Sequence, residues 1–316
     1  MNKRIFCAFA MFLIISSSAF ALNFNLCNKD TEGDNLYYEC VRVPGSSDLL
    51  IGSFGGMIKS TNHGKDWDNI NGEIGEYFIK GIAIKGNNIF AAVHNFGVLM
   101  SSDKGVTWIN KINGMTNFKT TCIIANANDI YIGTNGGGVY KSTNNGETWI
   151  NISTDLNVKD IACIAISGNS LIVGTYANGA FMTSNQGNSW QEISNGLDSK
   201  WVSSILVLDN VIFVGTREKS AGGIFYSTNN GKNWSASTAE LTKAPICAMF
   251  KIGNLVVAGT DTDKLIYSED KGKTWFENTD KLKIGKAILE VPNESILMQA
   301  YARKINLTFI LPGKEE

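Results

Sequence analysis

Six copies of one octapeptide, spaced almost evenly along the chain, constrain the fold more than any other feature. The shared pattern is S/T-x-D/N-x-G-x-x-W, and the copies are Ser60–Trp67, Ser101–Trp108, Ser142–Trp149, Thr183–Trp190, Ser227–Trp234 and Ser268–Trp275. Successive Trp residues stand 41 positions apart, except for an interval of 44 before Trp234. A fixed period of this length indicates a solenoid or a β-propeller, with one structural unit in each repeat.

Each octapeptide, called a box below, has the composition of a hairpin turn. The Asp or Asn side chain can accept hydrogen bonds from backbone N–H groups, and the Ser or Thr hydroxyl can reinforce the turn. The shared Gly stands where a positive φ is needed. The Trp offers a large apolar surface to a neighbouring repeat and an indole N–H that needs a carbonyl. We therefore interpret the boxes as structural elements and assign them no ligand.

Between the boxes, β-rich stretches alternate with short turns. In the fourth repeat, Ile161–Ile166 precedes a turn at Ser167–Asn169 and a second stretch at Ser170–Thr175. A third strand leads into each box and a fourth begins at its Trp. Four short strands per repeat describe one propeller blade. The prediction is an all-β fold: one β-propeller domain of four-stranded antiparallel blades over residues 22–316.

The boxes resemble the Asp-box (BNR) repeats of the sialidase-like and sortilin-like propeller superfamily. Their regular spacing over most of the chain is most similar to the photosystem II stability/assembly factor-like group. This resemblance implies a propeller whose box turns lie opposite the usual ligand face, and a general scaffold or assembly role. The arginine-rich patch of the true assembly factors is missing from this sequence, so the photosynthetic partner is not implied.

The remaining chain predicts a seventh blade beyond the six boxes. Candidate strands after the last box are Ile284–Val291, Ser295–Tyr301 and Lys304–Ile310, and Leu22–Cys27 is a further β-like segment. Pairing the N-terminal strand with the C-terminal blade would close the ring and remove two open sheet edges. The alternative is a six-bladed ring with the tail packed outside it.

The N-terminal residues have the pattern of a secretory signal. Lys3 and Arg4 precede the apolar run Ile5–Ile15, and Ala19–Ala21 forms an A-x-A cleavage pattern. The run is short for a bilayer span. We predict a signal peptide over residues 1–21, a secreted or periplasmic protein, and no membrane span after cleavage. An uncleaved anchor is the alternative.

Cysteine positions suit an exported propeller. An oxidising compartment makes Cys27 and Cys40 a plausible disulfide. Cys122, Cys163 and Cys247 fall at or next to one position of the first strand in their repeats. A small apolar side chain suits that crowded position, so we expect three buried free thiols.

Charge and histidine content exclude several classes of function. Without Lys3 and Arg4 the chain has 26 Lys and Arg residues against 29 Asp and Glu residues, and it has no basic run. This charge balance argues against nucleic-acid binding. His63, inside a box, and His94 are the 2 histidines and suggest no metal cluster. There is no phosphate loop. We expect no metal and no cofactor.

Candidate binding residues lie in two classes of loop on the face opposite the boxes. One class joins the second and third strands; the other joins neighbouring blades and includes Tyr77–Phe78 and Phe118–Lys119. Trp201 is the one Trp outside the boxes, and is either an exposed platform or a filler between blades. Loop 217–223 holds the three residues inserted before Trp234. The predicted partner-binding residues are His94, Phe96, Tyr176, Asn178, Trp201, Arg217, Asp261 and Asp263.

The predicted function is an exported, non-catalytic binding or assembly scaffold, monomeric, for a protein or carbohydrate partner. The alternative is a glycoside hydrolase, sialidase-like or glucanase-like. Sialidases grip a carboxylate with three arginines, and Arg42, Arg217 and Arg303 are the three that remain after residue 21. None has the Arg-Ile-Pro setting of the first sialidase arginine. Asp160, Asp261 and Asp263 lie on candidate loops, but nothing in the sequence pairs them at a catalytic distance. We predict no catalytic residue.

Overall fold

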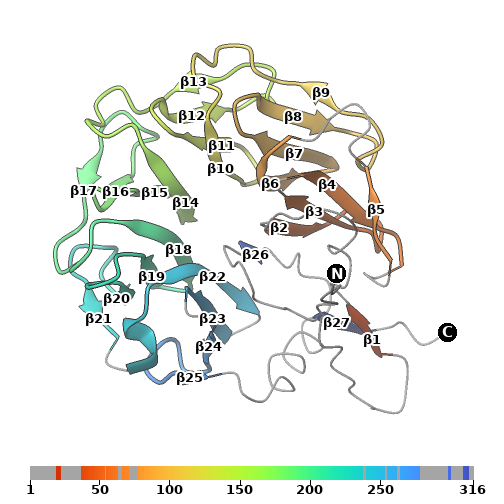
Figure 1. Ribbon diagram of the computed structural model, residues 1–316. Coiled ribbons are helices and arrows are strands. Elements are labelled where there is room, and N and C mark those ends of the chain that lie inside the picture. The colour runs from red at the N-terminus through yellow and green to blue at the C-terminus, as the bar shows by residue number, and fades with distance from the viewer. Residues whose placement is uncertain are drawn as a thin grey trace, which may run out of the picture.

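Six antiparallel sheets follow one another around a ring (Figure 1). The computed structural model describes residues 19–22, 37–53, 55–62, 66–70, 77–237, 240–252, 255–261, 264–277, 298–299 and 309–312. Within these ranges each boxed repeat forms one blade, so the six-bladed alternative is confirmed and the prediction of seven blades is wrong.

Each blade is a meander of four consecutive strands, numbered outward from the centre of the ring. Blades 1 to 3 are β2 (Tyr37–Arg42), β3 (Leu49–Ser53), β4 (Gly56–Ser60), β5 (Asp68–Asn69); β6 (Ile79–Lys85), β7 (Asn88–Val93), β8 (Gly97–Ser101), β9 (Ile109–Asn110); and β10 (Thr120–Ala125), β11 (Ile130–Thr134), β12 (Gly138–Ser142), β13 (Ile150–Asn151). Blades 4 to 6 are β14 (Ile161–Ser167), β15 (Ser170–Thr175), β16 (Ala180–Thr183), β17 (Gln191–Glu192); β18 (Val202–Leu208), β19 (Val211–Thr216), β20 (Gly223–Ser227), β21 (Ser235–Ala236); and β22 (Ile246–Ile252), β23 (Leu255–Thr260), β24 (Leu265–Ser268), β25 (Phe276–Glu277). A 3₁₀ turn, η2 (Glu240–Lys243), precedes blade 6.

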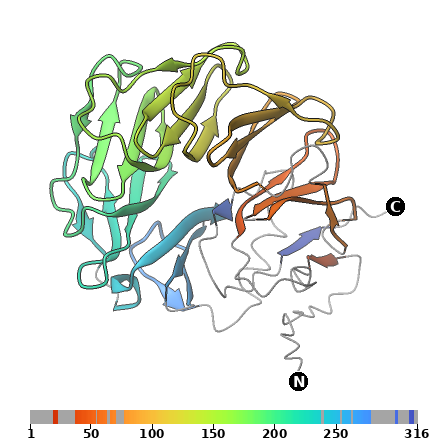
Figure 2. The same ribbon diagram turned by 45° about the horizontal axis from the view of Figure 1, so that its top comes forward.

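A described strand from the C-terminal part of the chain joins the first blade. Strand β26 (Met298–Gln299) pairs with Glu39 and Cys40 of β2, which gives blade 1 a fifth strand. It also contacts β22, so it lies between the first and last blades (Figures 1 and 2). Blade 1, like blade 6, already has four strands from its own repeat, and β26 is added at its inner edge.

The two ends of the chain pair with each other, but outside every blade. Strand β1 (Ala19–Leu22) is antiparallel to β27 (Phe309–Pro312) in a separate two-stranded sheet. Of the predicted N-terminal strand Leu22–Cys27, only Leu22 lies within the described residues, so its entry into a C-terminal blade stays a prediction. Ile284–Val291 and Cys27, the expected partner of Cys40, lie outside the described residues. Cleavage after Ala21 stays a prediction, and it would leave only Leu22 of β1.

Successive blades are joined by hydrophobic clusters, and each cluster contains the box Trp of the later blade. Trp108 packs with blade 1 residues Leu50 and Met57, and Trp149 packs with blade 2 residues Phe90 and Val98. The same arrangement places Trp190, Trp234 and Trp275 against the blades before them. The expected packing role of the box Trp is thereby confirmed.

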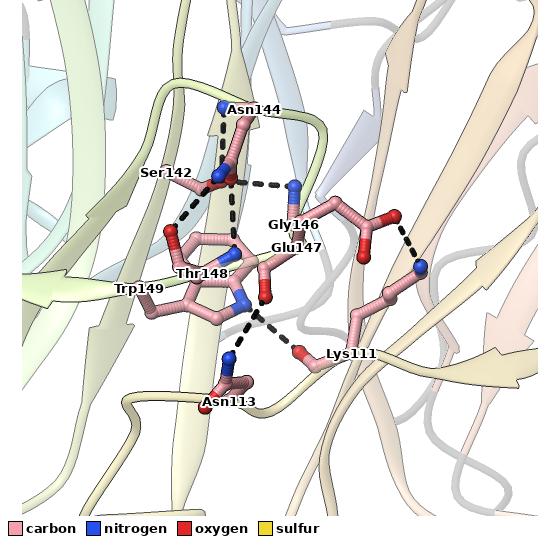
Figure 3. Close-up of polar contacts among 8 residues, drawn as sticks. All are labelled: Lys111, Asn113, Ser142, Asn144, Gly146, Glu147, Thr148 and Trp149. Carbon is pink, nitrogen blue, oxygen red and sulfur yellow. Dashed lines mark hydrogen bonds and ion pairs between the residues drawn. The ribbon is translucent and has the colours of Figure 1, made fainter.

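The turn chemistry predicted for the boxes is present in the structure. In blade 3, Oδ1 of Asn144 accepts hydrogen bonds from the Ser142 hydroxyl at 3.0 Å and the Thr148 N–H at 3.0 Å (Figure 3). The Gly146 N–H donates to Oγ of Ser142 at 2.9 Å. Gly146 has φ of 80° and Asn145 before it φ of 57°, so two consecutive left-handed residues make the turn.

The box also reaches into the preceding blade. The Trp149 indole N–H donates to the Lys111 carbonyl at 2.8 Å (Figure 3). The Trp149 backbone N–H donates to the Asn113 carbonyl at 2.8 Å. The Lys111 ammonium pairs with Glu147 at 2.5 Å. Indole N–H groups of Trp190 and Trp234 make the same crossing, to carbonyls of Ile152 and Ile193. Those of Trp108 and Trp275 bond within their own boxes, to Gly105 and Gly272.

The box of blade 2 has an ionisable residue at the turn position. The Thr107 hydroxyl donates to Asp103 at 2.5 Å and the Thr107 N–H donates to it at 2.8 Å. These bonds, the hydroxyl first, lower the pKa of Asp103 from 3.8 to about 2. Because the pKa is lower in the folded state, this contribution to stability is complete above about pH 4 and is lost as the pH falls towards 2.

We predict that Thr107→Val raises the pKa of Asp103, because it removes the strongest of these hydrogen bonds. NMR titration of the Asp103 carboxyl carbon measures this shift. The control is Thr148→Val in blade 3, where Asn144 takes the turn position, and it should leave the pKa of Asp103 unchanged. An equal pKa in wild type and Thr107→Val would contradict the assignment.

A glycine near the end of the second strand permits neighbouring blades to approach closely. A Cβ on Gly174 would overlap Cγ1 of Val202 in blade 5 and lie 2.6 Å from Sγ of Cys163. Gly52, Gly133 and Gly215 are equally crowded by Ile79, Ile161 and Ile246 of the next blades. The repeated Gly-Thr or Gly-Ser at this strand end is therefore a packing requirement.

We predict that Gly174→Ala lowers the free energy of unfolding by about 1–3 kcal/mol, the usual cost of overpacking a rigid core. The β-branched Val202 cannot swing away. The matched control is Gly55→Ala, where the added Cβ meets nothing within 4 Å. Thermal or urea denaturation measures both, and equal stabilities for the two variants would rule out the packing explanation.

Three cysteines occupy the inner strands, as expected. Cys122, Cys163 and Cys247 are buried free thiols in β10, β14 and β22. Burial raises the pKa of the Cys163 thiol, and the neighbouring Cys122 adds to the shift. A thiol held protonated in this way is a poor nucleophile, which agrees with a packing role.

Candidate binding face

One backbone hydrogen bond, repeated in blades 2 to 6, positions the predicted binding residues. The residue after the second strand donates its N–H to the carbonyl of the residue before the first strand. The five pairs are His94–Phe78 at 2.8 Å, Asn135–Lys119 at 2.8 Å, Tyr176–Asp160 at 3.4 Å, Arg217–Trp201 at 3.0 Å and Asp261–Pro245 at 3.0 Å. His94, Tyr176, Arg217 and Asp261 are thus equivalent positions of one face, the loop face.

The loop face of blades 2 and 3 carries an aromatic cluster of Tyr77, Phe78, His94, Phe96 and Phe118. Ring centroids of Tyr77 and Phe96 are 4.8 Å apart, and those of Phe78 and His94 are 5.7 Å apart in an edge-to-face arrangement. Phe118 of the following loop borders Gly97, where a Cβ would lie 3.2 Å from its ring. Such ring pairs contribute about 0.5–1.5 kcal/mol beyond their buried area.

His94 ties blade 2 to blade 3 at this cluster. Its Nδ1 lies 3.0 Å from the Thr120 carbonyl oxygen, and its backbone forms an antiparallel bridge with Lys119. A carbonyl oxygen can only accept, so Nδ1 carries the hydrogen in this contact. The histidine is therefore oriented from both its backbone and its side chain.

A second group of side chains lies on blades 4 and 5. The rings of Tyr176 and Trp201 are 6.5 Å apart, and the Arg217 guanidinium lies over Trp201 at 5.6 Å from the ring centroid. Trp201 is 38% exposed. A cation over an exposed indole contributes about 0.5–1 kcal/mol. This stack brings together three of the predicted residues from two blades.

Large exposed aromatic side chains recur in one class of loop. Tyr77, Phe118 and Trp201 are each about two-fifths exposed, and all stand one or two residues before a first strand. At the equivalent positions of blades 4 and 5, the Lys159 ammonium donates to the Ser153 carbonyl and Lys200 pairs with Glu192 at 3.4 Å. The loop face therefore presents exposed aromatic side chains on blades 2, 3 and 5. Lys159 occupies the equivalent loop of blade 4, and Lys200 lies beside Trp201 on blade 5.

The other predicted residues are not among the ring contacts of these two groups. Asn178 is exposed, and its N–H donates to the Thr175 hydroxyl at 2.9 Å. Asp261 is exposed in blade 6, and Asp263 lies outside the described residues. Sequence reasoning placed Tyr77 and Phe118 on these loops without choosing them as contacts. Their separation of 41 positions, one full repeat, indicates that the two aromatic residues occupy equivalent positions of neighbouring blades.

Within the part of the chain that the structure describes, no group of three or more His, Cys, Asp or Glu could hold a metal ion. No described helix combines the length and apolarity that a bilayer crossing requires.

Over the described residues the fold is a six-bladed β-propeller, and its loop face carries exposed aromatic side chains. The chain belongs to the DUF6242 β-propeller domain family, whose model matches residues 110–315. The likeness of the boxes to Asp-box repeats stays a resemblance. No curated protein is significantly similar in sequence.

Solved structures share the fold at low sequence identity. YCF48 bound to a D1 peptide is 14% identical, with a TM-score of 0.63 over 84% of this chain and 87% of that chain. YCF48 from Cyanidioschyzon merolae, also 14% identical, has a TM-score of 0.59 over 83% and 88%. The GH74 enzyme of Niastella koreensis is 14% identical, with a TM-score of 0.61, and this chain spans 45% of its length. These likenesses show the fold alone.

We predict that Trp201 dominates the solvent-quenchable tryptophan fluorescence. The box Trp residues are buried or, for Trp190, half-buried. Acrylamide titration of wild type should show an accessible fraction that Trp201→Phe removes, whereas Trp149→Phe should retain it. An undiminished accessible fraction in Trp201→Phe would contradict the exposed position of this ring.

Proposed function

We propose that this protein is an exported, non-catalytic scaffold that binds a protein or glycan partner on the loop face. The observation that carries the proposal is the exposure of Tyr77, Phe118 and Trp201 in one class of loop. Exposed aromatic side chains clustered on one face are typical of binding hot spots.

The rigidity of the supporting scaffold favours binding. The repeated strand-end hydrogen bond fixes the loop backbones. Tyr77 packs against the Phe96 ring, and Trp201 makes a cation–π contact with Arg217. Side chains that are ordered before binding lose less conformational freedom on association. Two groups of aromatic residues on separate blades would contact an extended partner at two places.

The comparisons support a peptide or protein partner by analogy of fold. YCF48, which shares the propeller fold, is described with a bound peptide. Export is supported by the signal pattern of residues 1–21. For the glycoside hydrolase alternative, the GH74 enzyme shares the fold, and the candidate carboxylates here are Asp160 and Asp261.

We predict that Tyr77→Ala, Phe118→Ala and Trp201→Ala each weaken partner binding by about 5- to 30-fold, the effect of losing a hot-spot aromatic. Photo-crosslinking through these three positions in cells identifies the partner, and its affinity for each purified variant is then measured. Ile109→Ala is the matched control, because Ile109 is 53% exposed on the outer strand of blade 2.

Two results would count against the scaffold. Equal crosslinking from Ile109 and from the loop face would remove the preference for that face. Turnover of a β-glucan or sialoside by wild type, abolished by Asp160→Asn or Asp261→Asn, would instead establish the hydrolase alternative.

A further inference from the structure

A groove of about 570 Å³ opens between the box turns of blades 3 and 4, on the face opposite the loop face. Its floor is Lys141, its blade 3 wall includes Thr148, Ile150 and Ile152, and its blade 4 wall includes Gln186 and Asn188. A cavity of this volume lies within the range of about 300–1,000 Å³ typical of small-molecule sites.

An ion pair that joins the equivalent walls one blade earlier has no counterpart in this groove. Between blades 2 and 3, Lys111 and Glu147 join the two walls at 2.5 Å (Figure 3). One repeat later, Ile152 and Asn188 occupy these positions and cannot form an ion pair. The backbone is otherwise alike, since the Trp190 indole donates to the Ile152 carbonyl at 2.9 Å.

The loop before the box also differs between these blade pairs. Gly114 lies against the Trp149 carbonyl so closely that a Cβ would overlap it, and Gly196 lies in the same way against Trp234. At blades 3 and 4 the equivalent residue is Asp155. Trp190 is half-buried, whereas Trp149 is 3% exposed. The two blades still touch at the box turn, where a Cβ on Gly187 would overlap Ile152.

The groove has no uncompensated charge. The Lys141 ammonium lies 3.0 Å from Oδ2 of Asp129 and 2.9 Å from Oε1 of Gln186, and Lys141 is 8% exposed. An anionic or cationic ligand therefore finds no free partner in the lining. The remaining polar groups are hydroxyls and amides, which can both donate and accept hydrogen bonds.

The blade 3 wall adds apolar surface to these polar groups. Ile150 is 68% exposed on the short strand β13, and Ile152 follows it along the groove. Sugar rings present hydroxyls at their edges and C–H groups on their faces. Hydroxyls and amides beside an aliphatic wall match both parts of such a ring.

We propose that this groove binds a neutral oligosaccharide, independently of the partner on the loop face. The amides of blade 4 hydrogen-bond the sugar hydroxyls, and Ile150 contacts a ring face. Charge neutrality excludes acidic sugars from the site, because desolvating a carboxylate without a partner is unfavourable.

The test is NMR titration of the ¹⁵N-labelled full protein with maltotriose, cellotriose and triacetylchitotriose. At least one should bind with a dissociation constant between about 10 µM and 1 mM. The largest amide shifts should fall on Ile150, Gln186 and Asn188. Trigalacturonate, the charged comparison, should bind at least tenfold more weakly.

The double variant Ile152→Lys/Asn188→Glu copies the ion pair of blades 2 and 3 and should close the groove. We expect at least a tenfold loss of affinity, with an unchanged melting temperature to show that the ring still folds. The matched control is Val106→Glu, which places a carboxylate at the position of blade 2 equivalent to Asn188 and should bind like wild type. Trp201→Ala should also leave sugar binding unchanged.

Several results would overturn the proposal. These are the absence of shifts with all three neutral sugars at about 10 mM, shifts confined to the loop face, or tighter binding of trigalacturonate. Undiminished binding to a folded Ile152→Lys/Asn188→Glu variant would also overturn it. Each leaves the loop-face scaffold unaffected, because that proposal is tested by a different partner and different variants.

Discussion

The box Trp is the side chain on which the ring depends, because it belongs to one blade and is buried against the blade before it. Its ring enters the interblade cluster, and in blades 3 to 5 its indole N–H is satisfied by a carbonyl of the preceding blade. A blade cannot bury this side chain alone. Nearer the centre of the ring, Gly174 also depends on the next blade, because only a residue without a Cβ leaves room for Val202. Stability is therefore a property of blade pairs.

Much of this could be predicted from the sequence, because the repeat encodes local geometry. The left-handed Gly146, the hydrogen bonds of Asn144 and the buried Cys163 all follow from residue type and register. The count of blades did not follow. A β-like segment such as Ser295–Tyr301 carries no signal that says which edge it will pair with. The structure pairs Met298 with Cys40 of the first blade, which a strand count cannot reveal.

The candidate sites show the same division between local and non-local information. His94, Tyr176 and Arg217 could be placed on one face from their position after the second strand. The contact of Tyr77 with Phe96 depends on how two loops meet, and the stacking of Arg217 on Trp201 depends on the orientation of two side chains. The groove at Ile152 was missed for a related reason. It depends on residues in which one repeat differs from the repeat before it, whereas the box pattern consists of residues that the repeats share.

The pairing of β26 with β2 constrains the order in which the chain can fold during synthesis. Residues 298–299 complete a blade that begins at residue 37, and they also contact the last blade. During synthesis the growing chain can stack its blades one after another, but until its final segment emerges these blades form an open arc with two apolar ends. Ring closure thus joins the most distant parts of the sequence and comes last, as contacts of long sequence separation generally do. A chaperone or export factor that binds the chain before β26 has paired therefore binds an open arc of blades.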